Sequence, residues 1–185
     1  MKKIAVCMIF CLLLCGCSGQ QTINQAVDFR NRLTDSAGCK FICTITADYV
    51  EKLYSFTMDC GFDSAGNMTF SVIQPDSISG ITGEIDQAGG KLTFDEQALA
   101  FELMADGYIS PVSAPWLFVK TLRGGYIQSC SQEEDGFRIT LNDTYSEEAL
   151  QVDVWMNNES MPVFCEILWK GRRILSLEVS NFSYL

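Results

Sequence analysis

The stretch CKFICTITADY, residues 39–49, decides the fold of this chain, because an apolar residue stands at every odd position. A two-residue period is that of a β-strand with one face buried and the other in water. The next stretch, KLYSFTMDCGF at residues 52–62, alternates in the same way, with its apolar residues at even positions. The two stretches therefore predict neighbouring antiparallel strands that share one buried face.

The alternation continues along most of the remaining sequence. We expect short strands at residues 68–72, 81–85, 91–95 and 99–103 and further strands over the last third of the chain. Turn-forming residues separate some of these stretches at hairpin spacing, as in SAGN at 64–67 and QAGG at 87–90. The pattern predicts about 10–11 strands in one domain, without a repeat or a linker.

Two segments have a helical period instead. Near the start, five apolar residues repeat at helical spacing: Ile23, Ala26, Val27, Phe29 and Leu33. They predict a helix over residues 23–36 that ends before Gly38. A second helix begins close to Pro115 and ends at Gly124. Apolar side chains cover so much of it that it must lie on the buried face of the sheet. The predicted fold class is mainly β (α+β), a single curved antiparallel sheet covered by an N-terminal helix and an inserted helix.

The first residues, MKKIAVCMIFCLLLCGCSGQ, combine two lysines with an apolar run at positions 4–15. A membrane-spanning helix needs about 20 apolar residues, so this shorter run predicts a cleaved secretory leader. Leu14-Cys15-Gly16-Cys17 resembles the lipobox of bacterial lipoproteins. This resemblance implies cleavage after Gly16 and attachment of lipid, including palmitate-type acyl chains, to Cys17. The alternative is an ordinary secretory leader that happens to contain cysteines.

The lipoprotein interpretation divides the chain into a signal peptide at 1–16, a lipidated N-terminus and tether at 17–22, and a domain at 23–185. Of the 13 Lys and Arg residues, two lie in the leader, which leaves 11 against 23 Asp and Glu and a formal charge of −12. So negative a surface repels nucleic acids and anionic lipid headgroups. We therefore expect no nucleic-acid partner, and attachment to the extracytoplasmic face of the cell membrane through the lipid on Cys17.

The order of the elements, together with several short motifs, resembles the lipoprotein-localisation-factor (LolA/LolB-like) superfamily. The motifs are QPDSISGI at 74–81, GKLTF at 90–94, SPVSAP at 110–115, VWMNNESMPV at 154–163 and the final NF at 181–182. The resemblance is strongest to lipidated members from Gram-positive, spore-forming bacteria, including a spore-germination lipoprotein. It implies that residues 23–185 form an unclosed half-barrel with an apolar interior. In the carrier members of the superfamily, that interior receives the acyl chains of other lipoproteins.

A cup that binds acyl chains needs a concave apolar surface and a polar group near its rim. The predicted lining consists of Phe41, Phe56, Met58, Phe70, Phe94, Phe101, Trp116 and Phe118. An ordinary one-sided sheet also buries such residues, so the same set fits a filled core. The nearest candidates for a basic residue at the mouth are Arg30, Arg32 and Arg123. A solvated helix face explains these three arginines equally well.

An empty cup and a filled cup imply two alternative functions. In the first, a non-enzymatic, membrane-anchored lipoprotein binds a lipid or a lipoprotein acyl chain in its apolar cup. In the second, which the germination-type relatives suggest, the cup is filled by its own core, and the surface docks an envelope protein such as a cell-wall amidase. The first contact candidates for docking are Leu53, Trp155 and Tyr184, on predicted wet faces or at the chain end. An empty interior would favour the first function, and dense packing would favour the second.

Five cysteines remain beyond the lipobox: Cys39, Cys43, Cys60, Cys130 and Cys165. Pairing of the first two strands puts Cys60 opposite a position between Cys39 and Cys43. This register allows a disulfide, with Cys43–Cys60 ahead of Cys39–Cys60. The alternative is that all five are thiols in an apolar core.

The composition argues against an enzyme and against a cofactor. The chain has no histidine, which excludes Ser-His-Asp and Cys-His catalysis. A zinc site would have to use thiolates and carboxylates alone, and Cys39 and Cys43 do not have metal-ligand spacing. The acidic runs at 133–135 and 147–148 lie in loops, where solvated turn charges are the ordinary explanation. We therefore expect no catalytic residue, no metal and no cofactor.

Overall fold

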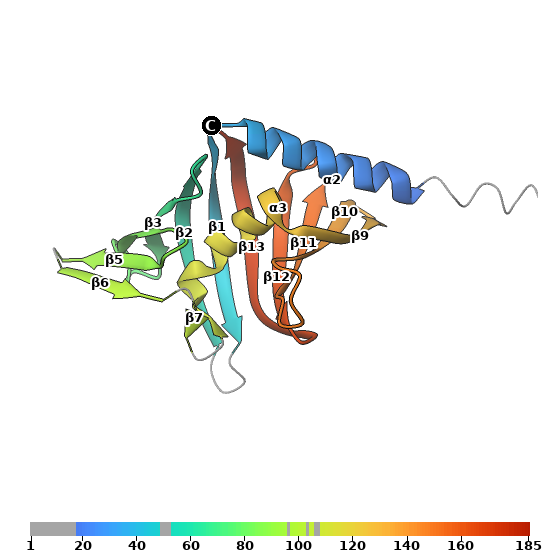
Figure 1. The fold of residues 1–185 in the computed structure, drawn as a ribbon. Helices are drawn as coiled ribbons and strands as arrows, with labels where there is room; N and C mark the ends of the chain where they lie inside the picture. The colour runs from blue at the N-terminus through green and yellow to red at the C-terminus, as the bar shows by residue number, and fades with distance from the viewer. Residues whose placement is uncertain (1–17, 49–52, 96, 103, 106–107) are drawn as a thin grey trace, which may run out of the picture.

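A computed structural model describes residues 18–48, 53–95, 97–102, 104–105 and 108–185. It contains one antiparallel sheet of eleven strands in the order β6-β5-β4-β3-β2-β1-β13-β12-β11-β10-β9. The strands are β1 (Gly38–Asp48), β2 (Leu53–Asp63), β3 (Met68–Gln74), β4 (Thr82–Ile85), β5 (Gly90–Phe94), β6 (Gln97–Phe101), β9 (Tyr126–Glu133), β10 (Gly136–Asn142), β11 (Gln151–Asn157), β12 (Pro162–Trp169) and β13 (Arg172–Tyr184). The two ends of the sheet, β6 and β9, do not pair, so the sheet is an unclosed half-barrel (Figure 1). The predicted fold class is confirmed.

The register of β1 and β2 follows the alternation in the sequence. Phe41 lies opposite Cys60 and Ile45 lies opposite Phe56, so the apolar residues of both strands share the inner face. On its other side β1 pairs with β13, with Cys43 opposite Val179. The first and last strands therefore meet in the middle of the sheet, and each half of the chain forms one wing.

Helix α3 (Ala114–Gly124) crosses the inner face of the sheet, in front of β1 and β13 (Figure 1). A short 3-10 turn, η1 (Pro111–Ser113), leads into it, and Pro115 stands in its first turn, where a missing N–H costs nothing. Most of its residues are buried, including Trp116, Leu117, Phe118 and Leu122. A helix that is apolar around most of its circumference is stable only when protein covers most of its surface. The predicted position of this helix on the buried face of the sheet is confirmed.

Helix α2 (Ser18–Asp35) runs along one rim of the sheet and packs against β9 and α3 (Figure 1). It buries Ala26, Phe29 and Leu33, three of the residues on its predicted apolar face. The helix begins at Ser18 rather than at residue 23, so residues 18–22, which the sequence assigns to the tether, are helical. Thr22 is fully buried, so the packed part of the helix begins within this segment.

The remaining described elements are two very short strands, β7 (Met104–Ala105) and β8 (Tyr108–Ile109), which pair only with each other. They lie between the β5–β6 hairpin and α3, in a segment for which the sequence predicts no separate sheet. The hairpin itself projects beyond the body of the molecule (Figure 1). This projection determines which part of the inner face remains uncovered.

Candidate functional site

The central part of the predicted cup is a filled core. Phe41, Met58, Phe70, Trp116 and Phe118 all lie on the inner face or on α3, and all are buried. The Phe118 ring meets the Phe41 ring edge-on with 5.7 Å between centroids. Phe118 and Met58 have no exposed surface at all, so no water-sized space adjoins either side chain. Here the structure matches the alternative in which the cup is occupied by its own side chains.

The other three predicted lining residues are not enclosed. Phe56 and Phe101 are half-buried, and Phe94 is 53% exposed, so its expected place inside a covered cup is wrong. Its strand, β5, belongs to the hairpin that extends past the cover of α3 (Figure 1). Alternation tells which face of a strand is apolar, but the reach of the covering helix decides whether that face is enclosed.

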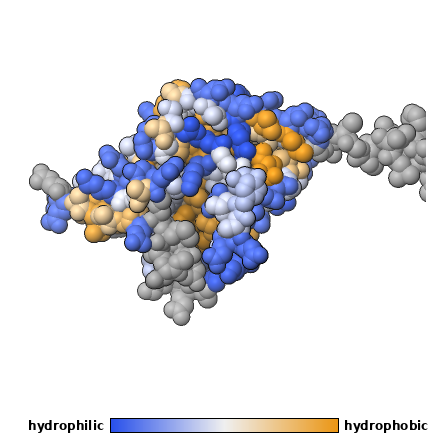
Figure 2. All heavy atoms as spheres, in the orientation of Figure 1, coloured by the Kyte–Doolittle hydropathy of each residue, from blue (hydrophilic) through white to orange (hydrophobic). Residues whose placement is uncertain are grey.

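Four apolar residues share this uncovered part of the inner face, and we call them the hairpin strip: Leu92, Phe94, Leu99 and Phe101. Leu92 lies directly opposite Leu99, and Leu99 is 66% exposed. The Phe101 ring lies over Gly90, its cross-strand partner, which explains its half-burial. Hydrophobic residues are visible on the projecting hairpin at the left of Figure 2. Leu92 and Leu99 are not among the lining residues predicted from the sequence, although both lie on the apolar side of their alternating stretches.

Hydrogen bonds fasten α3 at both ends. The Trp116 Nε1–H donates to the carbonyl of Gly66 at 2.9 Å, on the turn between β2 and β3. Arg123 donates from Nη1 and Nη2 to the carbonyls of Asp63 and Ser64, each at 3.1 Å. Arg30 of α2 donates from Nε to the carbonyl of Leu122 at 2.8 Å. Two of the three candidate arginines therefore hold α3 in place, Arg123 on the turn between β2 and β3 and Arg30 on helix α2.

Arg32, the third candidate, lies over the ring of Tyr184 with its guanidinium carbon 5.7 Å from the centroid. Trp155 lies on the outer face, as predicted, and is half-buried there, whereas Tyr184 is half-buried on the inner face, so its predicted exposure is wrong. Tyr184 packs against Phe29 of α2, and Trp155 packs against Phe164 at 5.3 Å between centroids. Leu53 is 70% exposed, as predicted.

We expect Arg30→Ala to lower the free energy of unfolding by about 1.5 kcal/mol, because it removes a charged donor and leaves the Leu122 carbonyl without this partner. Urea unfolding of the full chain would measure the difference. The matched control is Arg172→Ala, which removes an exposed arginine and should change stability by less than about 0.5 kcal/mol. Equal effects of the two substitutions would contradict a role of Arg30 in holding α3.

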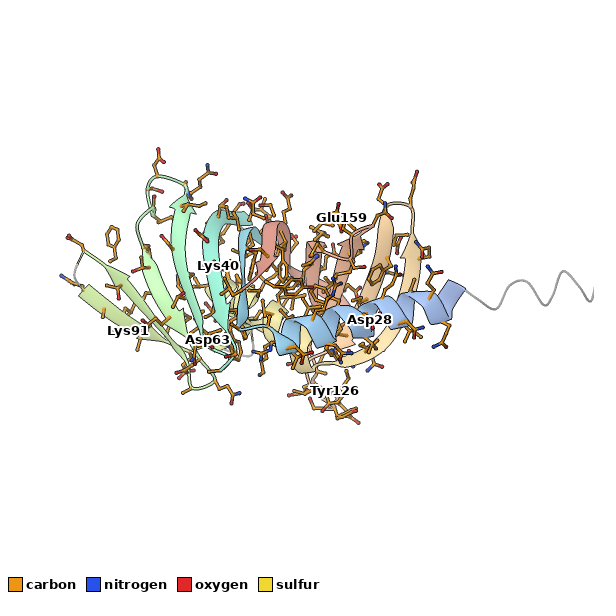
Figure 3. The ribbon with its side chains drawn as sticks, turned by 90° about the horizontal axis from the view of Figure 1, so that it is seen from above. Asp28, Lys40, Asp63, Lys91, Tyr126 and Glu159 are labelled. Carbon is orange, nitrogen blue, oxygen red and sulfur yellow. The ribbon has the colours of Figure 1, made fainter. Side chains whose placement is uncertain are left out.

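An open groove of about 910 Å³ lies at the end of the β5–β6 hairpin opposite its turn, next to Gly90 and Phe101. Its lining includes four carboxylates, on Asp63, Glu84, Asp86 and Glu102, and one lysine, Lys91; we call it the acidic groove. Figure 3 labels Asp63 and Lys91 on the same wing of the sheet. No described lysine or arginine forms an ion pair with any of the four carboxylates. The groove therefore favours a cationic group.

Hydrogen bonds keep at least one of these four carboxylates, that of Asp63, in its charged form. The Asp63 carboxylate accepts hydrogen bonds from the backbone N–H of Asn67 at 2.9 Å and from its side-chain amide at 3.0 Å. These bonds, the backbone one foremost, lower the pKa of Asp63. Asp86 accepts hydrogen bonds from the backbone N–H groups of Ala88 and Gly89 at 2.7 and 3.1 Å.

A second groove of about 490 Å³, on the outer face, is also polar, with Lys40, Asp59 and Thr69 in its lining.

The five described cysteines are free thiols. Cys60 lies opposite Phe41, between Cys39 and Cys43 as predicted, and the sulfurs of Cys43 and Cys60 are 3.9 Å apart. The hydrogen bond with Cys43 and burial raise the pKa of Cys60, and burial raises the pKa of Cys165. Burial also raises the pKa of Cys39 to about 12. The thiols of Cys39, Cys60 and Cys165 are therefore protonated and weakly reactive. The Cys43–Cys60 disulfide stays a prediction for oxidising conditions.

The buried thiols predict a loss of stability at alkaline pH. The ordinary pKa of 9.0 applies to Cys39 in the unfolded chain, against about 12 in the folded one. Its stabilising contribution is complete below pH 9 and decreases as the pH rises towards 12, since only the unfolded state readily ionises. Urea unfolding at stepped pH should show this decline, and Cys39→Ala should make it shallower. A free energy of unfolding that is constant from pH 9 to 11 would contradict the prediction.

Other features bear on the class of protein. Among the described residues, no helix is both long and apolar enough to cross a membrane. In the same part of the chain, no three Cys, Asp or Glu side chains are grouped so as to hold a metal ion. The lipobox and Cys17 lie outside the described residues.

No protein-family model matches this sequence, and a search of curated proteins found no match. Solved structures are similar in fold. A LolA-superfamily protein, NE2245 from Nitrosomonas europaea, is 11% identical, covers 85% of this chain and 92% of its own, and has a TM-score of 0.43. The lipoprotein LppX of Mycobacterium tuberculosis is 14% identical, with 88% and 93% covered and a TM-score of 0.43. LprF of Mycobacterium bovis is 10% identical, with 88% and 93% covered and a TM-score of 0.47. These likenesses concern the fold, and the lipidated spore-germination subtype stays a prediction.

Proposed function

We propose that this chain is a non-enzymatic lipoprotein of the bacterial envelope that binds a segment of another protein through the uncovered part of its inner face. The observation that carries the proposal is the packing of α3. Phe118 and Phe41 occupy the centre of the cup, and the hairpin strip is an apolar surface of the inner face that remains accessible. A cell-wall enzyme such as an amidase is the class of partner that the sequence resemblance suggests.

The envelope location rests on the N-terminal sequence. The short apolar run and the LCGC motif at 14–17 support lipid attachment at Cys17 and a position on the extracytoplasmic face of the membrane. Metabolic labelling with a palmitate analogue tests this directly. The full chain should become labelled, and the Cys17→Ala variant should not.

A second candidate function is the binding of a lipid or an acyl chain. It is favoured by the exposure of Leu99 and Phe94, whose neighbours in the hairpin strip, Leu92 and Phe101, pack against the core. On this alternative, the hydrophobic ligand would lie on the hairpin strip and not in the centre of the cup.

A photo-crosslinking amino acid at position 99, in the full chain produced in its membrane, separates the two functions. Protein binding predicts an adduct that is larger by a discrete protein mass, whereas lipid binding predicts a small mass increase that lipid extraction methods identify. The control is the same crosslinker at position 53, because Leu53 is equally exposed but lies away from the hairpin. Identical products at both positions, or none at 99, would contradict binding at the hairpin strip.

A further inference from the structure

The hairpin ends the sheet in an unprotected edge strand. Strand β6 reads QALAF at residues 97–101, without a charge or a proline. Proteins usually protect an edge with charged residues, proline or a covering element, because unpaired backbone groups there will accept another strand. The opposite edge, β9, has α2 packed against it. The β6 edge lacks each of these protections among the described residues, and it is open to the addition of a strand.

The two faces of β6 suit an added strand. On the inner face, Leu99 would gain an apolar neighbour from the incoming strand, since side chains of adjacent strands lie about 5 Å apart. On the outer face, Ala98 and Ala100 are too small to obstruct the approach of another backbone. The added segment therefore needs apolar residues at alternate positions.

The position of the acidic groove indicates in which orientation an added strand would pair with β6. Ala100, Phe101 and Glu102 belong to its lining, so the groove lies at the C-terminal end of β6. A strand antiparallel to β6 would have its N-terminal end there. Every neighbouring pair in the eleven-stranded sheet is antiparallel, and an added strand continues this arrangement most simply.

We infer that β6 accepts, as a twelfth and antiparallel strand, an extended protein segment with alternating apolar residues and lysine or arginine on its N-terminal side. The backbone of the segment pairs with β6, its apolar residues cover Leu99, and its basic residues enter the acidic groove. This inference deepens the proposed function, on which it rests, by specifying the chemistry and the orientation of the bound segment.

The charges make other occupants less favourable. Two copies of β6 paired antiparallel about Leu99 would place Glu102 of each copy opposite position 96 of the other, which is also a glutamate, and these like charges repel each other. A fatty acid or phospholipid would bring a negative headgroup towards the four carboxylates of the groove. A basic segment instead supplies the charge that this surface lacks.

Two synthetic peptides with blocked ends test the inference: KKVTVTV, with its lysines at the N-terminus, and VTVTVKK, with the same composition reversed. Fluorescence anisotropy would measure their affinity for the full chain in lipid nanodiscs. We expect KKVTVTV to bind about tenfold more tightly, the effect of a few exposed charge pairs. Hydrogen exchange should show that this peptide slows the exchange of backbone amides at residues 97–101.

The double variant Glu84→Gln, Glu102→Gln should remove the preference for KKVTVTV. Both side chains are exposed, so the fold should be retained, and the unfolding midpoint would verify this. Equal affinities for the two peptides, tighter binding of VTVTVKK, or no protection of residues 97–101 would each overturn the inference. If the crosslinker at position 99 still captured a protein in that case, the proposed function would stand and only the added strand would be wrong. An adduct between two copies of this chain would overturn both in favour of self-association.

Discussion

Phe118→Ala should lower the free energy of unfolding by about 3–5 kcal/mol, the range for removing a large aromatic side chain from a packed core. Phe118 is fully buried on α3 and meets Phe41 edge-on. The Phe41 ring also stacks on Phe182 of β13, with centroids 5.9 Å apart, so the substitution would leave a cavity beneath a continuous aromatic cluster. Urea unfolding monitored by circular dichroism would measure the loss.

The control for Phe118→Ala is Leu53→Ala, which removes a large apolar side chain from the surface. Since Leu53 is 70% exposed, we expect a change of less than about 0.5 kcal/mol. The substitution at Phe118 also tests the filled cup. If α3 covered an open cavity, the loss of this ring would lower the free energy of unfolding only slightly, and a decrease below about 1 kcal/mol would contradict a filled core.

Gly38→Ala should destabilise the protein by about 2–4 kcal/mol through backbone strain and a direct collision. Gly38 joins the end of α2 to β1 with φ +153°, a conformation that favours glycine. A Cβ at this position would collide with the backbone carbonyl oxygen of Phe62 on β2. Gly38 also accepts a hydrogen bond from the N–H of Leu185 at 2.9 Å, so β1 cannot move aside without disturbing both of its neighbours.

Gly66→Ala separates these two causes. Gly66 has φ +95°, but a Cβ there would meet nothing within 4 Å. This variant should therefore show the cost of strain alone, about 1 kcal/mol. Comparison of the two thermal unfolding curves would measure the difference, and equal losses would mean that the close approach of β2 to Gly38 has no energetic consequence.

The sequence predicts the sheet well where the period of two is unbroken. The inner faces of β1 and β2, the position of Cys60 between Cys39 and Cys43, and the place of α3 all follow from alternation and apolarity. Periodicity is a property of a single segment, however, and it cannot tell how far a helix reaches across neighbouring strands. The exposure of Phe94 and the filled centre of the cup both depend on that reach.

A local irregularity explains the misplaced Tyr184. The odd residues of β13 up to Val179 point inward, which predicts a wet position for an even residue such as Tyr184. The register between β1 and β13 shifts between Lys40 and Ile42, close to Asn181, whose φ is +54°. A bulge of this kind changes which residues point inward, and Tyr184 comes to lie opposite Cys39 and against Phe29. The sequence carries no strong signal for the bulge, since asparagine occurs in many turns.

The meeting of β1 and β13 in the middle of the sheet determines the order in which the chain can fold. The six strands from β1 to β6 can pair as they are synthesised, because each neighbours the next along the chain. The central pair joins Cys39 to Tyr184, so it must close a loop that contains nearly the whole domain, and such non-local contacts form slowly. Until residues 172–184 have emerged, β1 and β12 are both left as bare edges, which exposes the incomplete sheet to aggregation.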